Sequence, residues 1–298
     1  MLNPNQLPEL KLLFIFVSVV KNQGFANAQQ ELNLSTSAIS TYMSQLENHI
    51  GIKLCTRGRG GFGLTLKGEM FYEQVLILFQ ELNRFTEKAS QIKGELSGTI
   101  NIGIIDSTIT EPKFPVERII ERFSEKNPHV HIRLEIHSPY ELQMGVLENK
   151  FDVAIGSFFN KMSGIIYHPL YKEQHWLFCS DKHPLFLQRQ LSVGQITHEN
   201  MVRRSYWSQH ILAKHGFHSS SATVESMEAQ LILILSGKYI GFLPEHYAQY
   251  WVEQKRLKVL LPSTFGYDAP FFLIVRRGRV KETVIREFKN AITHYQKS

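Results

Sequence analysis

The sequence predicts an α/β protein that begins with a small, mainly helical domain, continues through one long helix and ends in two α/β subdomains. Three observations support this prediction. Residues 25–66 show two helical patterns that flank a tight turn and precede a glycine-rich hairpin. Apolar residues then repeat with a heptad period over residues 71–92, and strand-like segments alternate with helix-like ones from residue 99 onward.

Three helices are predicted in the N-terminal segment, over Leu7–Asn22, Phe25–Leu32 and about Thr36–Ile50. The apolar residues of each recur at the 3.6-residue period of one buried helix face. Asn33 and Ser35 favour a turn and a helix N-cap between the second and third helices. A helix, a short turn and a second helix with a polar tip form the helix-turn-helix arrangement.

The exposed side of the third predicted helix is short, uncharged and rich in hydroxyl groups. Its serines and threonines are Ser35, Thr36, Ser37, Ser40, Thr41 and Ser44. Such small side chains can approach phosphates and base edges closely. The helix tip therefore predicts contact with double-stranded DNA.

A hairpin with a glycine-rich tip is predicted directly after the third helix. Lys53-Leu54-Cys55 and Leu64-Thr65-Leu66 are typical of two short strands, and the tip between them carries Arg57 and Arg59. Glycine allows positive φ angles and close backbone approach, and arginine supplies phosphate contacts. The hairpin therefore has the features of the wing in a winged helix.

The glycines of this hairpin also fit the G-x-G-x-x-G pattern of dinucleotide-binding proteins. That pattern is meaningful where a second parallel strand ends in an acidic residue about 20 positions further on. No such strand is predicted after this hairpin. We therefore favour the wing over a nucleotide site.

One long helix is predicted over Thr65–Lys93. We favour a coiled-coil interface over an amphipathic helix that lies on its own core, because a strict 3.5-residue period is what a partner helix requires. The seam has no obvious partner within its own chain, since Gly94 and Gly98 separate it from the next domain. Its residues, spaced alternately by four and three, are Phe71, Val75, Leu78, Leu82, Phe85, Ala89 and Ile92.

From residue 99 the pattern changes to strands that alternate with helices, which predicts parallel sheets. The first set is Thr99–Ile105, Phe114–Lys126, Val130–Ile136, Pro139–Asn149 and Phe151–Ile155, in the order strand, helix, strand, helix, strand. The second set is strand Trp176–Ser180, strand Met201–Arg204, helix Ser226–Ser236 and strand Tyr239–Phe242, followed by Pro244. A further strand, Pro270–Val275, and a last helix, Val280–Tyr295, form the C-terminal segment. We interpret the two sets as two α/β subdomains joined near residues 168–170 and 266–269, with the C-terminal segment completing the first.

The chain resembles the LysR-type transcriptional regulators. The N-terminal residues that carry the resemblance are Leu34, Ser35, Ala38, Ile39, Ser40, Leu46, Glu47, Gly51, Leu54, Arg57, Leu64, Thr65 and Gly68. Softer matches in the α/β part are Leu147-x4-Asp152-Val153-Ala154-Ile155, His183-Pro184-Leu185 and Gly237-x3-Gly241-x2-Pro244. Together they cover nearly the whole chain.

The resemblance implies a winged helix-turn-helix DNA-binding domain over residues 1–66 and a dimerising linker helix over residues 67–94. It further implies an effector-binding domain over residues 95–298, similar to periplasmic solute-binding proteins. Within that domain, subdomain I would comprise residues 95–169 and 267–298, and subdomain II residues 170–266. The family also implies homotetramers built as dimers of dimers.

Resemblance and helix pattern together give the candidate DNA-binding residues Asn27, Ser35, Thr36, Ser37, Ser40, Thr41, Arg57 and Arg59. The family often has Gln-Pro where this chain has Thr36-Ser37, and Arg-Gln where it has Thr41-Tyr42. These positions read bases in the family. The departures therefore concern the preferred operator sequence and leave the class unchanged.

A small-molecule effector is expected in a cleft between the subdomains, at the carboxyl ends of their strands. Strand alternation lets only one of Arg203 and Arg204 face this cleft, where a surface role is as plausible as ligand binding. Ser226 opens a helix and could equally be an N-cap. An arginine and a helix N-terminus suit a carboxylate-bearing ligand. Phe158 and Phe159 follow the strand over residues 151–155 and could wall the pocket. The candidate effector-binding residues are Ser107, Thr108, Phe158, Arg203 and Ser226, of which the resemblance implies Ser107, Thr108 and Ser226.

Composition adds little to this prediction. The net charge of +6 and pI of about 9.2 suit a polyanionic partner only weakly. Cys55 and Cys179 lie in different predicted domains, so a disulfide bond is not expected, which fits a reducing cytoplasm. The apolar run Leu12–Val20 is too short to span a membrane and lacks the features of a signal peptide.

No catalytic signature is present, and the closest histidine pairs, His129-x-His131 and His215-x2-His218, lack a cysteine or carboxylate at ligand spacing. We therefore expect no catalytic residues, no metal site and no cofactor. The function predicted is that of a cytoplasmic LysR-type regulator that binds operator DNA as a homodimer or homotetramer and senses a small molecule. The alternative is a cytosolic solute-binding or carrier protein with an accessory N-terminal helical domain. A carrier would need neither the wing arginines nor the hydroxyl-rich helix tip.

Overall fold

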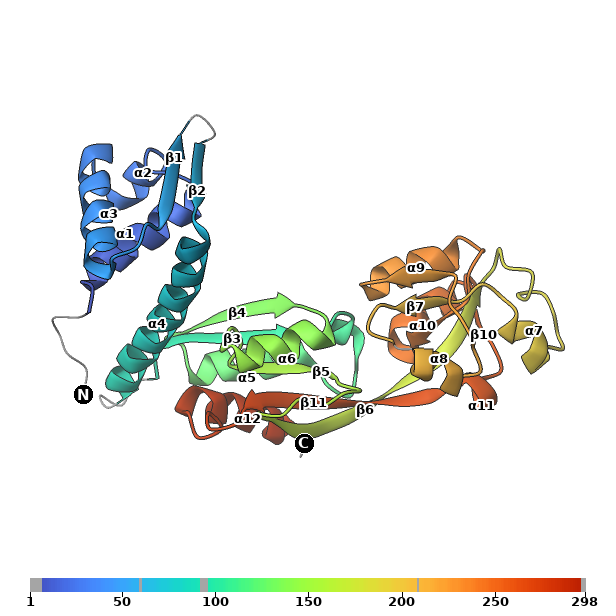
Figure 1. The fold of residues 1–298 in the computed structure, drawn as a ribbon. Coiled ribbons are helices and arrows are strands. Elements are labelled where there is room, and N and C mark those ends of the chain that lie inside the picture. The colour runs from blue at the N-terminus through green and yellow to red at the C-terminus, as the bar shows by residue number, and fades with distance from the viewer. Residues whose placement is uncertain (1–6, 59–60, 92–95, 208, 296–298) are drawn as a thin grey trace. The chain divides into compact units, whose positions relative to one another are not determined.

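The computed structural model describes residues 7–58, 61–91, 96–207 and 209–295, and gives the backbone alone for residues 57, 58, 84, 87–91, 209 and 211. The chain forms two compact units, Met1–Lys93 and Gly94–Ser298 (Figure 1). Within the described ranges, none of the helices has the length and apolar character needed to cross a membrane.

The first unit contains helices α1 (Leu10–Lys21), α2 (Ala28–Leu32), α3 (Thr36–Ile50) and α4 (Leu66–Gln91), and the hairpin strands β1 (Cys55–Gly58) and β2 (Gly61–Leu64) (Figure 1). The predicted bounds of the third helix are confirmed. The second helix starts three residues later than predicted, because Gln23 and Gly24 turn the chain with positive φ angles before it. The hairpin strands are likewise displaced from their predicted positions into the glycine-rich stretch.

Two local features fix the ends of α3. The Ser35 side chain accepts a hydrogen bond from the Ala38 N–H at 3.2 Å, which caps the first turn. Gly51 takes a left-handed conformation, with φ 71°, and ends the helix. A good cap at one end and a glycine at the other explain why the sequence pattern located this helix correctly.

The core of the first unit lies among α1, α3 and the first turns of α4. Phe16, Ile39 and Leu46 are fully buried there. A Cβ atom on Gly68 would lie 2.0 Å from the backbone oxygen of Leu54, so only glycine lets α4 approach the start of the hairpin so closely. Gly68 is one of the residues that carry the family resemblance, and this close approach explains why a glycine stands there.

The α4 helix differs from the prediction in one respect. Val75 is only 3% exposed and Phe71 packs against Phe16, with ring centroids 5.7 Å apart. The expectation that the whole seam lacks a partner in its own chain is therefore wrong for its first turns, which complete the core of this unit. Further along, Leu78 and Phe85 are exposed. The side chain of Ala89 and the whole of Ile92 lie outside the described residues.

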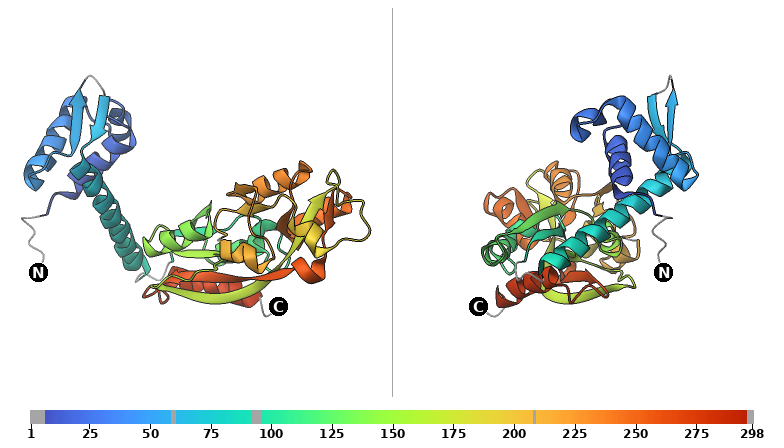
Figure 2. Two further views of the ribbon diagram at one scale, coloured as in Figure 1. Left: turned by 45° about the vertical axis from the view of Figure 1, so that its right-hand side comes forward. Right: turned by 90° about the vertical axis from the view of Figure 1, so that its left-hand side faces the viewer.

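A seven-stranded mixed sheet forms the frame of the second unit, with strand order β10-β6-β11-β5-β3-β4 and β9 paired to β6. Strands β3 (Gly98–Ile104), β4 (Val130–Ile136) and β5 (Val153–Ser157) are parallel to one another. The long strands β6 (Ile165–Ser180) and β11 (Tyr267–Arg276) run antiparallel, side by side (Figures 1 and 2). The predicted strand Trp176–Ser180 is only the end of β6.

Two separate hydrophobic cores lie along this frame. The first core combines buried residues of 100–165 and 269–292, and α5 (Val116–Lys126), α6 (Pro139–Leu147) and α12 (Thr283–Tyr295) contribute to it. The second core combines two clusters of buried residues within 177–265. Strands β6 and β11 pass from one core to the other, so the two cores share a rigid pair of strands.

The second core is built from short elements. They are α7 (Val193–Thr197), β7 (Val202–Arg204), α8 (Gln209–Lys214), β8 (Ala222–Val224), α9 (Met227–Leu235), β9 (Gly241–Pro244), α10 (Glu245–Glu253), β10 (Leu257–Val259) and α11 (Pro262–Phe265). Of these, the prediction included only β7, α9 and β9. The other six were not predicted, and all of them except α10 have six residues or fewer.

Both cysteines are thiols rather than disulfide partners, as predicted. Cys179 is buried in the second core, and this burial raises the pKa of its thiol to about 12. The thiol is therefore inert at neutral pH.

Candidate functional site

The N-terminal end of α3 presents the hydroxyl-rich surface that the sequence predicted. Thr36, Ser37 and Thr41 are exposed, whereas Ser40 is half-buried. Ser35 is exposed too, but its side chain is engaged in capping the helix and lies 3.0 Å from the Ser37 hydroxyl. The Thr41 hydroxyl donates to the Ser37 carbonyl at 3.0 Å, which leaves its oxygen able to accept from a partner.

Asn27 occupies the N-cap position of α2 and is exposed, and its Nδ2 donates to the Asn22 carbonyl at 2.9 Å. The side chain thereby joins the end of α1 to the start of α2. Arg59 and the side chain of Arg57 lie outside the described residues. The backbone of Arg57 belongs to β1 and pairs with Phe62 of β2.

The α3 helix is tied to the hairpin by one buried carboxylate. Glu47 Oε1 accepts from the backbone N–H groups of Leu54 at 2.8 Å and Cys55 at 3.3 Å, and its Oε2 lies 2.7 Å from Lys53 Nζ. Burial opposes the charge on Glu47, but these three hydrogen bonds outweigh it and hold the pKa of the carboxyl below its ordinary value. The hairpin therefore starts at a fixed position beside α3.

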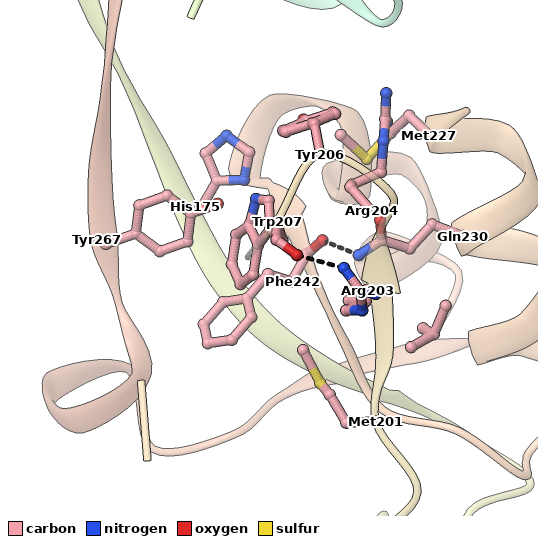
Figure 3. A pocket seen from close by; sticks show the side chains of 11 residues that line it. His175, Met201, Arg203, Arg204, Tyr206, Trp207, Met227, Gln230, Phe242 and Tyr267 are labelled. Carbon is pink, nitrogen blue, oxygen red and sulfur yellow. Dashed lines mark hydrogen bonds between the residues drawn. The ribbon is translucent and has the colours of Figure 1, made fainter. Parts of the chain in front are cut away.

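In the second unit a cleft lies between the two cores. Its widest part has a volume of about 530 Å³ and is lined by Asp106, Ile136, His137, Ser138, Glu141, Arg204, Glu225 and Ser226. Two water-sized cavities of about 10 and 20 Å³ lie deeper, and both are lined by His175, Tyr206, Trp207, Met227 and Tyr267. Figure 3 shows the smaller of the two. The volume of the wide part is typical of a site for a small organic molecule.

One ion pair crosses this cleft. Asp106, at the end of β3, accepts from Arg204 of β7 through both oxygens, at 2.9 and 3.1 Å. The same carboxylate accepts from the backbone N–H of Met227, the first residue of α9. Asp106 therefore already provides what a ligand carboxylate would provide: a bidentate partner for an arginine and an anion at a helix N-terminus.

Four buried polar atoms of residues that line the cleft have no hydrogen-bond partner among the described residues. They are Arg204 Nε, Ser157 Oγ, Gln230 Oε1 and His175 Nδ1. Buried polar groups without partners are uncommon in proteins and are expected where a ligand or water completes them. These atoms could therefore hydrogen-bond a ligand in the cavities that the aromatic side chains line.

The structure sorts the predicted cleft residues into two groups. Ser107 lines the inner cavity, and Ser226 lines the wide one while its side chain caps α9 by accepting from the Ala229 N–H at 3.2 Å. By contrast, Thr108 is 2% exposed and donates to the Ile105 carbonyl at 2.8 Å. Its hydroxyl therefore serves the turn rather than the cavity surface.

Two further predicted residues have neighbours that are better placed. Phe158 is buried in the first core, against Tyr167, and Phe159 lines the cavity instead. The Arg203 guanidinium donates to Ser220 Oγ and to the carbonyl of Trp207, whereas the Arg204 guanidinium donates to Asp106 across the cleft. Both arginines line one of the deeper cavities (Figure 3), but only Arg204 also lines the wide part of the cleft.

Comparison with known proteins agrees with this arrangement. Residues 10–69 match the bacterial regulatory helix-turn-helix protein, lysR family, and residues 93–297 match the LysR substrate binding domain. The HTH-type transcriptional activator BauR of Pseudomonas aeruginosa is 34% identical over 287 residues, covering 95% of this chain and 94% of BauR. The HTH-type transcriptional regulator YtlI of Bacillus subtilis is 27% identical over 194 residues, covering 65% of this chain and 62% of YtlI.

Solved structures share the fold. Full-length CbnR in complex with its target DNA aligns with a TM-score of 0.72 at 17% identity, covering 97% of this chain and 100% of CbnR. CrgA, a LysR-type transcriptional regulator from Neisseria meningitidis, aligns with a TM-score of 0.54 at 18% identity, covering 96% of this chain and 98% of CrgA.

Proposed function

Since the chain belongs to the LysR family and is a DNA-binding transcriptional regulator with an effector-binding domain, we propose which of its residues perform these two tasks. The N-terminal end of α3 reads base edges, with Thr36, Ser37 and Thr41 as its exposed hydroxyls. Arg57 and Arg59 of the hairpin contact phosphates, and Asn27 and Ser35 position the helix-turn-helix. The effector binds in the cleft at Asp106 and Arg204. The family is one of transcriptional regulators and not of enzymes.

The Asp106–Arg204 pair carries the effector proposal. It is the contact that joins the end of β3 on one side of the cleft to β7 and α9 on the other. A ligand carboxylate that took the place of Asp106 would find the same donors, and the Arg204 Nε offers one more. Displacing Asp106 would also break this link across the cleft, which couples ligand binding to a change in the effector-binding domain.

We further propose that the three-part division predicted from the sequence describes the working protein. Residues 1–66 bind DNA, residues 67–94 dimerise, and residues 95–298 bind effector, with subdomain I (95–169 and 267–298) and subdomain II (170–266) on either side of the cleft. The exposed apolar residues of α4 support dimerisation, and two dimers would form the homotetramer. Binding to chromosomal DNA implies a cytoplasmic location.

Thermal unfolding of the full chain against a panel of small carboxylates tests the effector site. A ligand that binds only the folded state raises the melting temperature. We expect the shift to be lost in Arg204→Gln, because the bidentate partner is gone, and kept in Arg256→Gln, a matched change at an arginine that pairs with Asp181 outside the cleft. A carboxylate that stabilises Arg204→Gln as strongly as the wild type would contradict the proposed role of this arginine.

A further inference from the structure

A cluster of buried ionisable side chains lies outside the proposed effector contacts. Glu111 follows the short helix η2 (Thr108–Thr110), Glu173 lies in β6 and His246 lies in α10. Both carboxylates are 3% exposed, and the His246 side chain is 8% exposed. Each residue offers one metal-ligand atom, and the three atoms lie within 4.8 Å of one another.

The spacing of these atoms suits direct coordination of one ion. His246 Nε2 lies 3.0 Å from Glu173 Oε1 and 3.4 Å from Glu111 Oε2. Ligand atoms bound to one tetrahedral ion at about 2.0–2.1 Å lie roughly 3.3–3.4 Å apart. The two distances from His246 are therefore close to those that an ion would impose, and the two carboxylate oxygens lie within 4.8 Å of each other.

The hydrogen bond on the other side of the His246 ring determines what Nε2 presents. Nδ1 lies 2.7 Å from Thr110 Oγ1, and that hydroxyl donates to the Ser107 carbonyl at 3.2 Å. A hydroxyl has a single proton, so Thr110 must accept from Nδ1–H. The other ring nitrogen, Nε2, therefore faces the carboxylate oxygens of Glu173 and Glu111, so all three potential ligand atoms point at one position.

No lysine or arginine side chain pairs with these two carboxylates in the part of the chain that the structure describes. Among the described residues, the ion-pair partners of Glu111 and Glu173 are imidazoles only: His246 for both, and His175, whose Nε2 lies 2.6 Å from Glu173 Oε2. The one other hydrogen bond to Glu111 within those residues comes from the backbone N–H of Lys113. Two buried carboxylates are costly without matching positive charge, and a divalent ion would balance both.

Two buried polar atoms beside the cluster lack partners within the described ranges. They are Tyr171 Oη and His175 Nδ1. His175 is 7% exposed, and its Nε2 lies 2.6 Å from Glu173 Oε2. A residue that contacts a metal ligand in this way holds the ligand in its orientation.

We propose that Glu111, Glu173 and His246 bind one divalent transition-metal ion of the Zn²⁺ type. Two carboxylates and one neutral imidazole form the three-ligand oxygen and nitrogen set that Zn²⁺ accepts, and no sulfur ligand belongs to it. Glu111 comes from the strand β3 side of the cleft and His246 from α10 of the second core, so the ion would join the two sides beneath the effector site. No local sequence pattern indicates this site, since its residues are 62 and 73 positions apart, from 111 to 173 and from 173 to 246.

Calorimetric titration of the EDTA-treated full chain with ZnCl₂ tests the proposal. We expect one saturable equivalent, bound at least tenfold more weakly by Glu173→Gln and by His246→Gln. The matched control is the double variant His129→Gln/His131→Gln, which removes an exposed histidine pair able to bind Zn²⁺ adventitiously. It should bind the first equivalent as tightly as the wild type. Equal affinity in His246→Gln, or loss of the site in the control, would overturn the assignment.

A second measurement on the wild type does not depend on how the variants fold. X-ray absorption of the protein with one equivalent of Zn²⁺ should show oxygen and nitrogen ligands with one imidazole. Sulfur ligation would place the ion at a cysteine instead and overturn the proposal. So would the absence of any site that saturates at one equivalent.

Discussion

At the scale of single residues, several positions that carry the family resemblance have a physical explanation. Ser35 caps α3, Gly51 ends it, and Gly68 permits the close approach of α4 to Leu54. Glu47 accepts two backbone hydrogen bonds at the start of the hairpin. In the second unit, buried Asp152 joins Arg279 at 2.7 Å and the backbone of Asn101, which ties the C-terminal segment to the first core. These residues maintain the shape of the two sites rather than contact a ligand.

Glu47→Gln tests this explanation. The amide keeps the shape of the side chain but loses the charge that strengthens three hydrogen bonds, so we expect a loss of about 1–3 kcal/mol in the free energy of unfolding at pH 7. The folded-state pKa of Glu47 lies below its ordinary value of 4.5. Its contribution is therefore fully present above pH 4.5 and is lost as the pH falls through the lower folded-state pKa.

The difference between wild type and Glu47→Gln in urea unfolding should accordingly shrink below pH 4.5. Glu73→Gln, a change at an exposed glutamate of α4, serves as the control and should leave stability unchanged. A constant difference across this pH range would mean that the charge on Glu47 contributes nothing.

At the scale of elements, the sequence predicted those that carry their own boundary signals. The bounds of α3 and β4 were predicted correctly, because α3 has a cap and a glycine stop, and β4 is a run of alternating residues. The length of β6 was missed, since Pro169 and three polar residues, Lys172, Glu173 and Gln174, interrupt its apolar pattern. Its extension depends on pairing with β11, which lies far along the chain.

The α4 helix illustrates the limit of periodicity. One heptad stripe supplies both the core of the first unit, through Val75, and an exposed surface, through Leu78 and Phe85. We expect Leu78→Asp/Phe85→Asp to dissociate the dimer, because charges in a dry interface oppose pairing. The first unit should stay folded, since neither side chain is buried in its core. Val75→Asp should unfold it.

Sedimentation velocity measures the outcome for these α4 variants, with circular dichroism as the check on folding. If Leu78→Asp/Phe85→Asp kept the oligomeric state of the wild type, this surface of α4 would not be the dimer interface.

The wing assignment is tested by Arg57→Ala/Arg59→Ala. Phosphate contacts carry no sequence information, so binding should weaken on operator and random duplexes alike. The slope of log K against log salt concentration should become shallower by about one unit for each phosphate-binding arginine that is removed. Fluorescence anisotropy at several salt concentrations measures both. If affinity and slope were unchanged, Arg57 and Arg59 would not be part of the DNA interface.

At the scale of the whole molecule, the sequence predicted the class and the order of its parts, whereas the contacts across the cleft had to come from the structure. Asp106 and Arg204 are 98 residues apart, and no local pattern links them. Alternation along β7 does not show which of Arg203 and Arg204 reaches Asp106. In the same way, the sequence does not show which of Phe158 and Phe159 lines the inner cavity, and in the structure it is Phe159.

The most direct test of the central claim is a selection from random duplexes with the full chain and with Thr41→Arg. Thr41 is exposed at the tip of α3 and its change adds the arginine that is commoner in the family. We predict that the wild type enriches one motif, and that the variant enriches a different motif with comparable total affinity, because a base-reading residue has changed while phosphate contacts remain. Identical motifs from both proteins, or no enrichment by the wild type, would contradict the claim that the tip of α3 reads the operator.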